Sequence, residues 1–180
     1  MNRCIRAIVP IALALTVGLT FAGEGGEKLA EPLKAFAPLL GKTWKGEFKN
    51  STPEKPVFDV ARWERALNGQ AIRVLHSVND GVYGGETLIV WDAKKKSLAY
   101  WYFTTAGFRT EGTMKHEDGK FIAHEVVAGA AKGITEVKST SKILPDGRLQ
   151  VTAEYLKDGK WDVAREVTYK VAPEAKVNFK

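Results

Sequence analysis

The sequence predicts an all-β protein, an antiparallel up-and-down barrel of roughly ten strands with a short N-terminal capping helix. Three observations predict this fold. Turn-forming pairs such as Asn68-Gly69 and Asp118-Gly119 recur after Gly41, and they supply the positive φ that tight hairpins require. The segments between the turns are rich in β-branched and aromatic residues, and residues 58–64 and 161–169 alternate with a period of two. Closing such a meander into a barrel removes its exposed edges.

The first 22 residues are expected to be a secretory signal peptide. Arg3 and Arg6 precede an apolar run over residues 7–22, which ends in small residues before the chain turns polar. This run is shorter than the roughly 20 apolar residues that a membrane-spanning helix requires. We therefore expect cleavage near Ala22, a periplasmic or secreted location and no stable membrane insertion after cleavage. The alternative is a retained N-terminal helix.

Residues 23–41 are expected to form a linker and the capping helix. An apolar stripe with helical spacing is formed by Leu29, Leu33, Phe36 and Leu40. Pro38 predicts a break near the end of this helix, and Gly41 closes it.

Residues 42–171 are expected to form the barrel, and residues 172–180 a C-terminal tail. A barrel with more than about eight strands leaves room inside for a ligand. No internal repeat and no second domain is apparent in the sequence. The predicted strands span residues 42–49, 58–67, 70–78, 82–91, 97–104, 108–115, 120–128, 132–143, 148–156 and 160–170.

Charge and cysteine content exclude several classes of function. The chain has 27 basic and 21 acidic residues, mostly interleaved, and the basic run 94–96 falls in a predicted turn. A nucleic-acid-binding surface would need a basic stripe with exposed aromatic residues, so we expect no nucleic-acid partner. The only cysteine, Cys4, precedes the apolar run and is lost on cleavage. The mature chain therefore has no disulfide, no cysteine nucleophile and no cysteine metal site.

Several motifs resemble the calycin barrels, the lipocalin and fatty-acid-binding group. Residues 39–48 resemble the Gly-x-Trp opening of these barrels, although two residues rather than one separate Gly41 from Trp44. The resemblance covers nearly the whole mature chain and implies a barrel fold, but it implies no known chemistry. A closer resemblance, to uncharacterised lipocalin-like bacterial proteins of the DUF1579-like group, is carried by Trp63-Glu64 and residues 67–70, 90–92, 102–107 and 165–170.

Histidines are the candidate ligands for a metal or a haem. The opening of the chain is also similar to that of nitrobindin-type haem barrels, which ligate iron through a histidine near the C-terminus. No histidine follows His124, so that ligand is missing and we expect no cofactor. His76 and His124 could form a zinc site with Glu125 or Glu86, but the short spacings typical of metal motifs are absent, and we expect no metal.

Charged residues at strand centres could face either side of the barrel. Arg62 shares a strand face with Glu64. Outward-facing residues would form ordinary cross-strand ion pairs, whereas inward-facing ones would line a polar cavity, because an unpaired buried charge is too costly to persist. Fatty-acid-binding proteins hold a carboxylate with an inward arginine and tyrosine of the last strands. Arg165 and Tyr169 are similar to that pair, at a spacing of four rather than two.

Residues 100–103 are apolar on both faces of their strand. One face must therefore pack on something beyond the barrel interior. The capping helix is the expected partner, with a ligand wall or a dimer contact as alternatives.

No motif in the sequence identifies an enzyme. The leading hypothesis is an exported barrel that binds a small, partly apolar molecule in its interior, and a cavity below about 100 Å³ would rule it out. One alternative is an enzyme with His76 or His124 as base. Another is a structural or interaction protein without a ligand, which could form a homodimer. The candidate lining residues are Arg62, Arg73, His76, Glu86, Tyr102, Arg109, His124 and Arg165.

Overall fold

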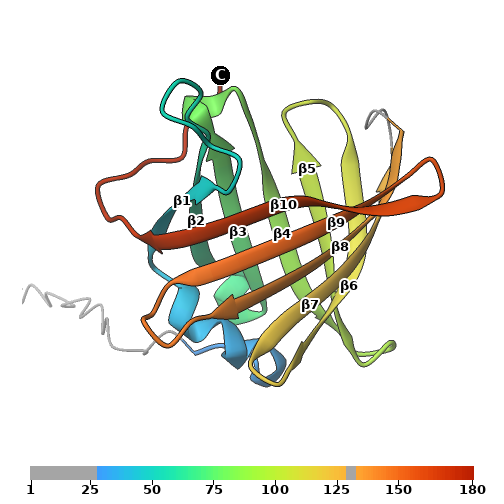
Figure 1. Ribbon diagram of the computed structural model, residues 1–180. Coiled ribbons are helices and arrows are strands. Elements are labelled where there is room, and N and C mark those ends of the chain that lie inside the picture. Colours follow the sequence, from blue (N-terminus) through green and yellow to red (C-terminus); the bar gives the residue numbers. More distant parts are fainter. Residues whose placement is uncertain (1–27, 129–132) are drawn as a thin grey trace, which may run out of the picture.

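The computed structural model describes residues 28–128 and 133–180, whose strands form one closed antiparallel barrel (Figure 1). Each strand pairs with its neighbours in sequence, and the first pairs with the last to close the barrel. All ten expected strands are confirmed, with ends within two residues of the prediction. They are β1 (Thr43–Phe48), β2 (Phe58–Ala66), β3 (Ala71–Val78), β4 (Tyr83–Asp92), β5 (Ser97–Thr104), β6 (Arg109–Glu117), β7 (Lys120–Ala128), β8 (Ile134–Ile143), β9 (Leu149–Lys157) and β10 (Lys160–Val171).

The predicted turn chemistry is confirmed in the connections between strands. Two short 3₁₀ turns, η2 (Leu67–Gly69) and η3 (Asn79–Gly81), join β2 to β3 and β3 to β4. Asn68 has φ 54° and Gly69 has φ 84°, in the left-handed region that asparagine and glycine tolerate. The expected signal peptide, residues 1–22, and its Cys4 lie outside the described residues. Within the part of the chain that the structure describes, no helix has the length and apolarity needed to cross a membrane.

The N-terminal segment forms a 3₁₀ helix, η1 (Glu31–Leu39), rather than the α-helix that the predicted stripe implies. A 3₁₀ helix has three residues per turn, so side chains three apart share one face. The buried residues are accordingly Leu33, Phe36 and Leu39, and Leu40 of the predicted stripe is only half-buried. η1 lies across one end of the barrel, at the bottom of Figure 1.

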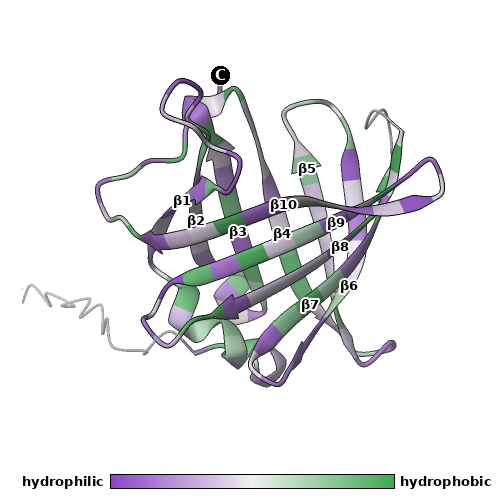
Figure 2. Ribbon diagram, viewed as in Figure 1, coloured by the Kyte–Doolittle hydropathy of each residue, from purple (hydrophilic) through white to green (hydrophobic). Residues whose placement is uncertain are grey.

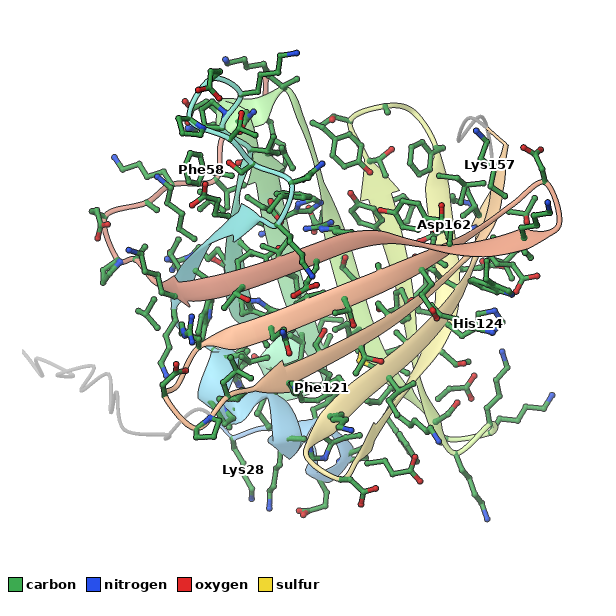
Figure 3. All side chains as sticks on the ribbon, viewed as in Figure 1. Lys28, Phe58, Phe121, His124, Lys157 and Asp162 are labelled. Carbon is green, nitrogen blue, oxygen red and sulfur yellow. The ribbon has the colours of Figure 1, made fainter. Side chains whose placement is uncertain are left out.

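Aromatic contacts fasten η1 to the barrel. The ring of Phe36 stacks on Phe121 of β7, with centroids 4.4 Å apart, and on Trp63 of β2, at 6.0 Å. Trp44 of β1 donates its indole N–H to the carbonyl of Leu39, 3.2 Å away. Figure 3 labels Phe121 beside this end of the barrel. Side chains of η1 and of the strands around it thus form a hydrophobic core that closes the end of the barrel covered by η1.

The expected packing of the capping helix against the outer face of residues 100–103 is wrong. Tyr100 and Tyr102 face the barrel interior, and Phe103 lies on the outer face with 53% of its surface exposed. Strands alternate their side chains between the two faces, and η1 covers the end of the barrel, not the outside of β5. Figure 2 shows the same alternation, with hydrophilic and hydrophobic residues following one another along the strands.

Candidate functional site

A cavity of about 530 Å³ occupies the barrel interior on the far side of the core from η1. This volume lies well within the roughly 300–1,000 Å³ of ordinary ligand sites, and far above the limit that would rule out the binding hypothesis. The exposed residue Ala106, in the turn between β5 and β6, also borders the cavity. The cavity therefore extends toward the end of the barrel that η1 does not cover.

Most of the cavity wall is apolar. Aliphatic, sulfur-containing and aromatic side chains come from seven of the ten strands and from the β5–β6 turn. Such a wall favours a ligand with a substantial apolar part, because burying apolar surface is the main favourable term in binding. The apolar lining residues are Ala61, Trp63, Val74, Ile89, Ala106, Phe108, Met114, Ala123, Val127, Ile134, Val137, Leu149, Val151 and Ala153.

Asp59 of β2 is the centre of a polar cluster on one wall of the cavity. Its carboxylate is 1% exposed. His76 Nδ1 lies 2.9 Å from Oδ1. On the other oxygen, Oδ2, Tyr169 donates its hydroxyl at 2.6 Å and Arg165 donates Nη2–H at 2.7 Å. Since a carboxylate can only accept hydrogen bonds, Nδ1 of His76 carries its proton.

Two tyrosines continue this cluster away from Asp59. His76 Nε2 lies 2.7 Å from the hydroxyl of Tyr102, and that hydroxyl shares a hydrogen bond with Tyr83, 2.9 Å away. The Asp59 cluster is thus a connected chain of six side chains from five strands: Tyr83, Tyr102, His76, Asp59, Arg165 and Tyr169. A buried polar network of this kind fixes the orientation of its members.

Electrostatics in the cluster keep Asp59 negatively charged and Arg165 positively charged. Burial alone would raise the pKa of Asp59, but hydrogen bonding and charge from His76, Arg165 and Tyr169 outweigh it and lower this pKa. Burial would lower the pKa of Arg165, but Tyr169 and Asp59 outweigh it, so the guanidinium stays charged. Burial raises the pKa of both Tyr102 and Tyr169, which keeps their hydroxyls protonated.

Glycines opposite the tyrosines make room for their rings. A Cβ at Gly46, which pairs with Tyr169 across β1 and β10, would lie 2.6 Å from the ring of Tyr169. A Cβ at Gly85 would lie 2.4 Å from the ring of Tyr102. Real Cβ atoms do not approach other atoms so closely, so only glycine permits these tyrosines to lie flat along the wall.

Glu125 of β7 is a second buried polar group in the cavity lining. It accepts a hydrogen bond from the hydroxyl of Thr110 on β6. Burial raises the pKa of Glu125, and the Thr110 hydrogen bond offsets only part of this effect. Gly112, its partner across β6 and β7, leaves space for the Glu125 backbone and Cβ to approach.

Three of the eight predicted lining residues face the cavity, namely His76, Tyr102 and Arg165. The other five correct the prediction, because their side chains lie on the outer face. There Arg62 pairs with Glu64 at 2.7 Å, and Arg73 pairs with Glu86 at 2.8 Å. In each case the neighbouring residues on the same strand point inward, since successive side chains of a strand alternate between faces.

The remaining two outward residues form similar surface pairs. Arg109 pairs with Glu111 at 2.8 Å, and His124 pairs with Glu136 at 2.6 Å. His124 lies at the outer edge of the barrel in Figure 3. An enzyme that uses a histidine base in the barrel interior would therefore depend on His76. Among the described residues, no group of three histidine, cysteine, aspartate or glutamate side chains is placed to hold a metal ion.

Sequence reasoning did not select Asp59, Tyr83, Glu125 or Tyr169 as lining residues. For Asp59 a signal was present, because Asp59 shares its strand face with the apolar residues Ala61 and Trp63. A charged residue in register with an apolar face is the pattern of a buried, paired charge. Tyr169 was singled out beside Arg165, and it does accept a hydrogen bond from Arg165 Nη2 at 2.9 Å.

The Asp59–His76–Tyr102 arrangement has the order of an orienting carboxylate, a base and a hydroxyl group, as found where hydroxyl nucleophiles are activated. The raised pKa of Tyr102 opposes that role, since burial and the neighbouring Tyr83 both disfavour the phenolate. These hydrogen-bonded side chains are better suited to hold hydroxyl groups in place as hydrogen-bonding partners. It can bind and orient the polar part of a small molecule.

Comparisons with known proteins identify the fold and no more. No protein-family model matches the chain, and no curated protein matches it. Among solved structures, that of Rv2717c from M. tuberculosis matches with a TM-score of 0.57 over 82% of this chain and 100% of that chain, at 15% sequence identity. This similarity shows a shared β-barrel fold. The closer resemblance to the DUF1579-like group stays a prediction.

Proposed function

We propose that this protein is an exported barrel that binds a small, largely apolar molecule with a polar group. The observation that carries the proposal is the 530 Å³ cavity with the Asp59 cluster on one wall and apolar side chains on the others. A protein that needed only a stable barrel would fill this volume with its own side chains, because empty space in a core is costly.

Export is part of the same proposal. Its support is the basic start, the apolar run and the small residues before residue 22. Periplasmic or secreted binding proteins handle their ligands outside the cytoplasm, and a barrel without cysteines in its mature chain needs no particular redox environment there. The resemblance to uncharacterised lipocalin-like bacterial proteins is consistent with a binding role and names no ligand.

Filling the cavity is expected to abolish binding. Ala123 of β7 and Ala153 of β9 both line the cavity, so the double variant Ala123→Phe with Ala153→Phe places two rings inside it. We expect the wild-type protein to bind the uncharged fluorescent dye N-phenylnaphthylamine with a dissociation constant in the micromolar range, typical of modest apolar burial. The filled variant should bind it at least tenfold more weakly. Fluorescence titration measures both.

The matched control adds the same two rings to the same strands on the outer face. His124 and Glu154 are the exposed neighbours of the two alanines, so His124→Phe with Glu154→Phe should bind the dye as the wild type does. Equal binding by the filled variant and the wild type would contradict a ligand site in the interior. Circular dichroism should show that all three proteins keep the same strand content.

A further inference from the structure

The charge balance of the cavity indicates which class of ligand it accepts, and this inference rests on the proposed function. Arg165 is the only lysine or arginine among the described residues that line the cavity. An arginine inside a barrel could bind the carboxylate of a ligand. In this protein, however, the guanidinium already has a carboxylate partner, Asp59, at 2.7 Å.

Both carboxylate oxygens of Asp59 are engaged within the cluster. Oδ1 is bonded to His76, and Oδ2 accepts from Arg165 and Tyr169. Asp59 and Arg165 thus bring one negative and one positive permanent charge to the cluster, and these two charges cancel. No other permanent positive charge faces the described cavity wall.

A carboxylate ligand would therefore enter a site without a free countercharge. It would lose its hydration and would meet the charge of Asp59 on one side and the buried carboxyl of Glu125 on another. Taking an ion out of water without a partner is unfavourable, so the binding of a carboxylate is opposed here.

The cluster can still donate a hydrogen bond to an uncharged ligand. Both hydrogen bonds of the Arg165 guanidinium to described residues come from Nη2, so Nη1 has no acceptor within the described part of the chain. The side chain of Arg165 retains 22% of its accessible surface, and it borders the cavity. A carbonyl oxygen is a suitable acceptor for such a donor, and hydrogen bonds from a charged donor are strong.

We propose that the cavity selects an uncharged, largely apolar molecule with a carbonyl-type acceptor, such as an ester, ketone or amide, and that Asp59 excludes carboxylates by neutralising Arg165. Asp59 is therefore a specificity-determining residue. Its effect is repulsive, since it blocks a wrong class of ligand instead of contacting the right one.

Two compounds with the same acyl chain test this proposal. Methyl decanoate and decanoate differ in charge and both carry a carbonyl group. We expect the wild-type protein to bind methyl decanoate at least tenfold more tightly than decanoate, measured by displacement of N-phenylnaphthylamine at pH about 8, above the range in which histidines usually titrate. Tighter binding of decanoate would overturn the proposal.

The variant Asp59→Asn separates charge selectivity from simple preference for apolar compounds. It removes the negative charge and keeps an amide oxygen as acceptor, so Arg165 gains an unneutralised charge. We expect the affinity for decanoate to rise at least tenfold and that for methyl decanoate to change less than threefold. Unchanged decanoate affinity would overturn the proposal. Glu111→Gln, on the outer face beside Arg109, is the control for a distant charge and should leave both affinities unchanged.

The outcomes also distinguish this inference from the function on which it rests. If the dye binds and neither acyl compound displaces it, the proposed ligand class is wrong, while binding in the interior stands. If the dye itself fails to bind, the proposed function is wrong. Should Asp59→Asn fail to fold, tighter binding of decanoate than of methyl decanoate by the wild-type protein would still overturn the proposal.

Discussion

Replacing Asp59 with alanine is expected to lower the free energy of unfolding by about 3–5 kcal/mol, the usual cost of removing one partner of a buried ion pair. The substitution leaves the Arg165 guanidinium without its acceptor, and His76 and Tyr169 each lose a hydrogen-bond partner. Urea denaturation measures the change, and the thermal midpoint should fall by about 10 °C for a chain of this length.

The control for Asp59→Ala removes a carboxylate from the outer face. Glu111 is paired with Arg109 at 2.8 Å, but both side chains are about half exposed, so Glu111→Ala should leave stability unchanged. Equal effects of the two substitutions would show that the Asp59 cluster does not stabilise the barrel.

The lowered pKa of Asp59 also predicts the direction of acid sensitivity. A carboxyl group whose pKa is lower in the folded state contributes stability above its unfolded pKa of about 3.9, and this stability is lost as the pH falls through the folded-state value. The difference in stability between the wild-type protein and Asp59→Ala should therefore be largest near neutral pH and should shrink below pH about 4.

Replacing Phe36 with alanine is expected to have a similar effect through a different cause. The Phe36 side chain is fully buried and stacks between η1 and the barrel on Phe121 and Trp63. Truncating a buried phenylalanine typically costs about 3–5 kcal/mol, because apolar contacts are lost and a cavity remains. Urea denaturation monitored by tryptophan fluorescence should show this loss.

Phe103→Ala is the matched control for Phe36→Ala. Phe103 is of the same residue type but is half exposed on the outer face of β5. We expect it to change stability by less than about 0.5 kcal/mol, as is usual at exposed positions. A loss of stability at Phe36 no larger than at Phe103 would mean that η1 does not anchor the closed end of the barrel.

The strands of this protein were predictable because its turns are marked in the sequence. Pairs such as Asn68-Gly69 favour left-handed backbone, and they divided the chain correctly into ten strands. The helix type was less predictable. Pro32 and Pro38 lie close together in a nine-residue segment, and the observed helix winds with three residues per turn, which selects Leu39 over Leu40 as the buried residue.

The direction in which each side chain points was the least predictable part of the site. A strand period of two gives two sets of residues, and a shift of one residue exchanges the face on which each set lies. Arg62 was a candidate lining residue whose direction the sequence left open, and its neighbours Ala61 and Trp63 are the residues that line the cavity. The partner of a buried charge also lies far away in sequence, as with Asp59 and Arg165, so only the closed barrel brings the two together.

Native mass spectrometry of the protein purified from its own host tests the central claim most directly. The wild-type protein should carry an additional mass that denaturation releases, and the variant Ala123→Phe with Ala153→Phe should lack it. We expect the released compound to be uncharged and largely apolar. A wild-type protein and a filled variant that carry the same additional mass, or no additional mass on either, would contradict a ligand held inside the barrel.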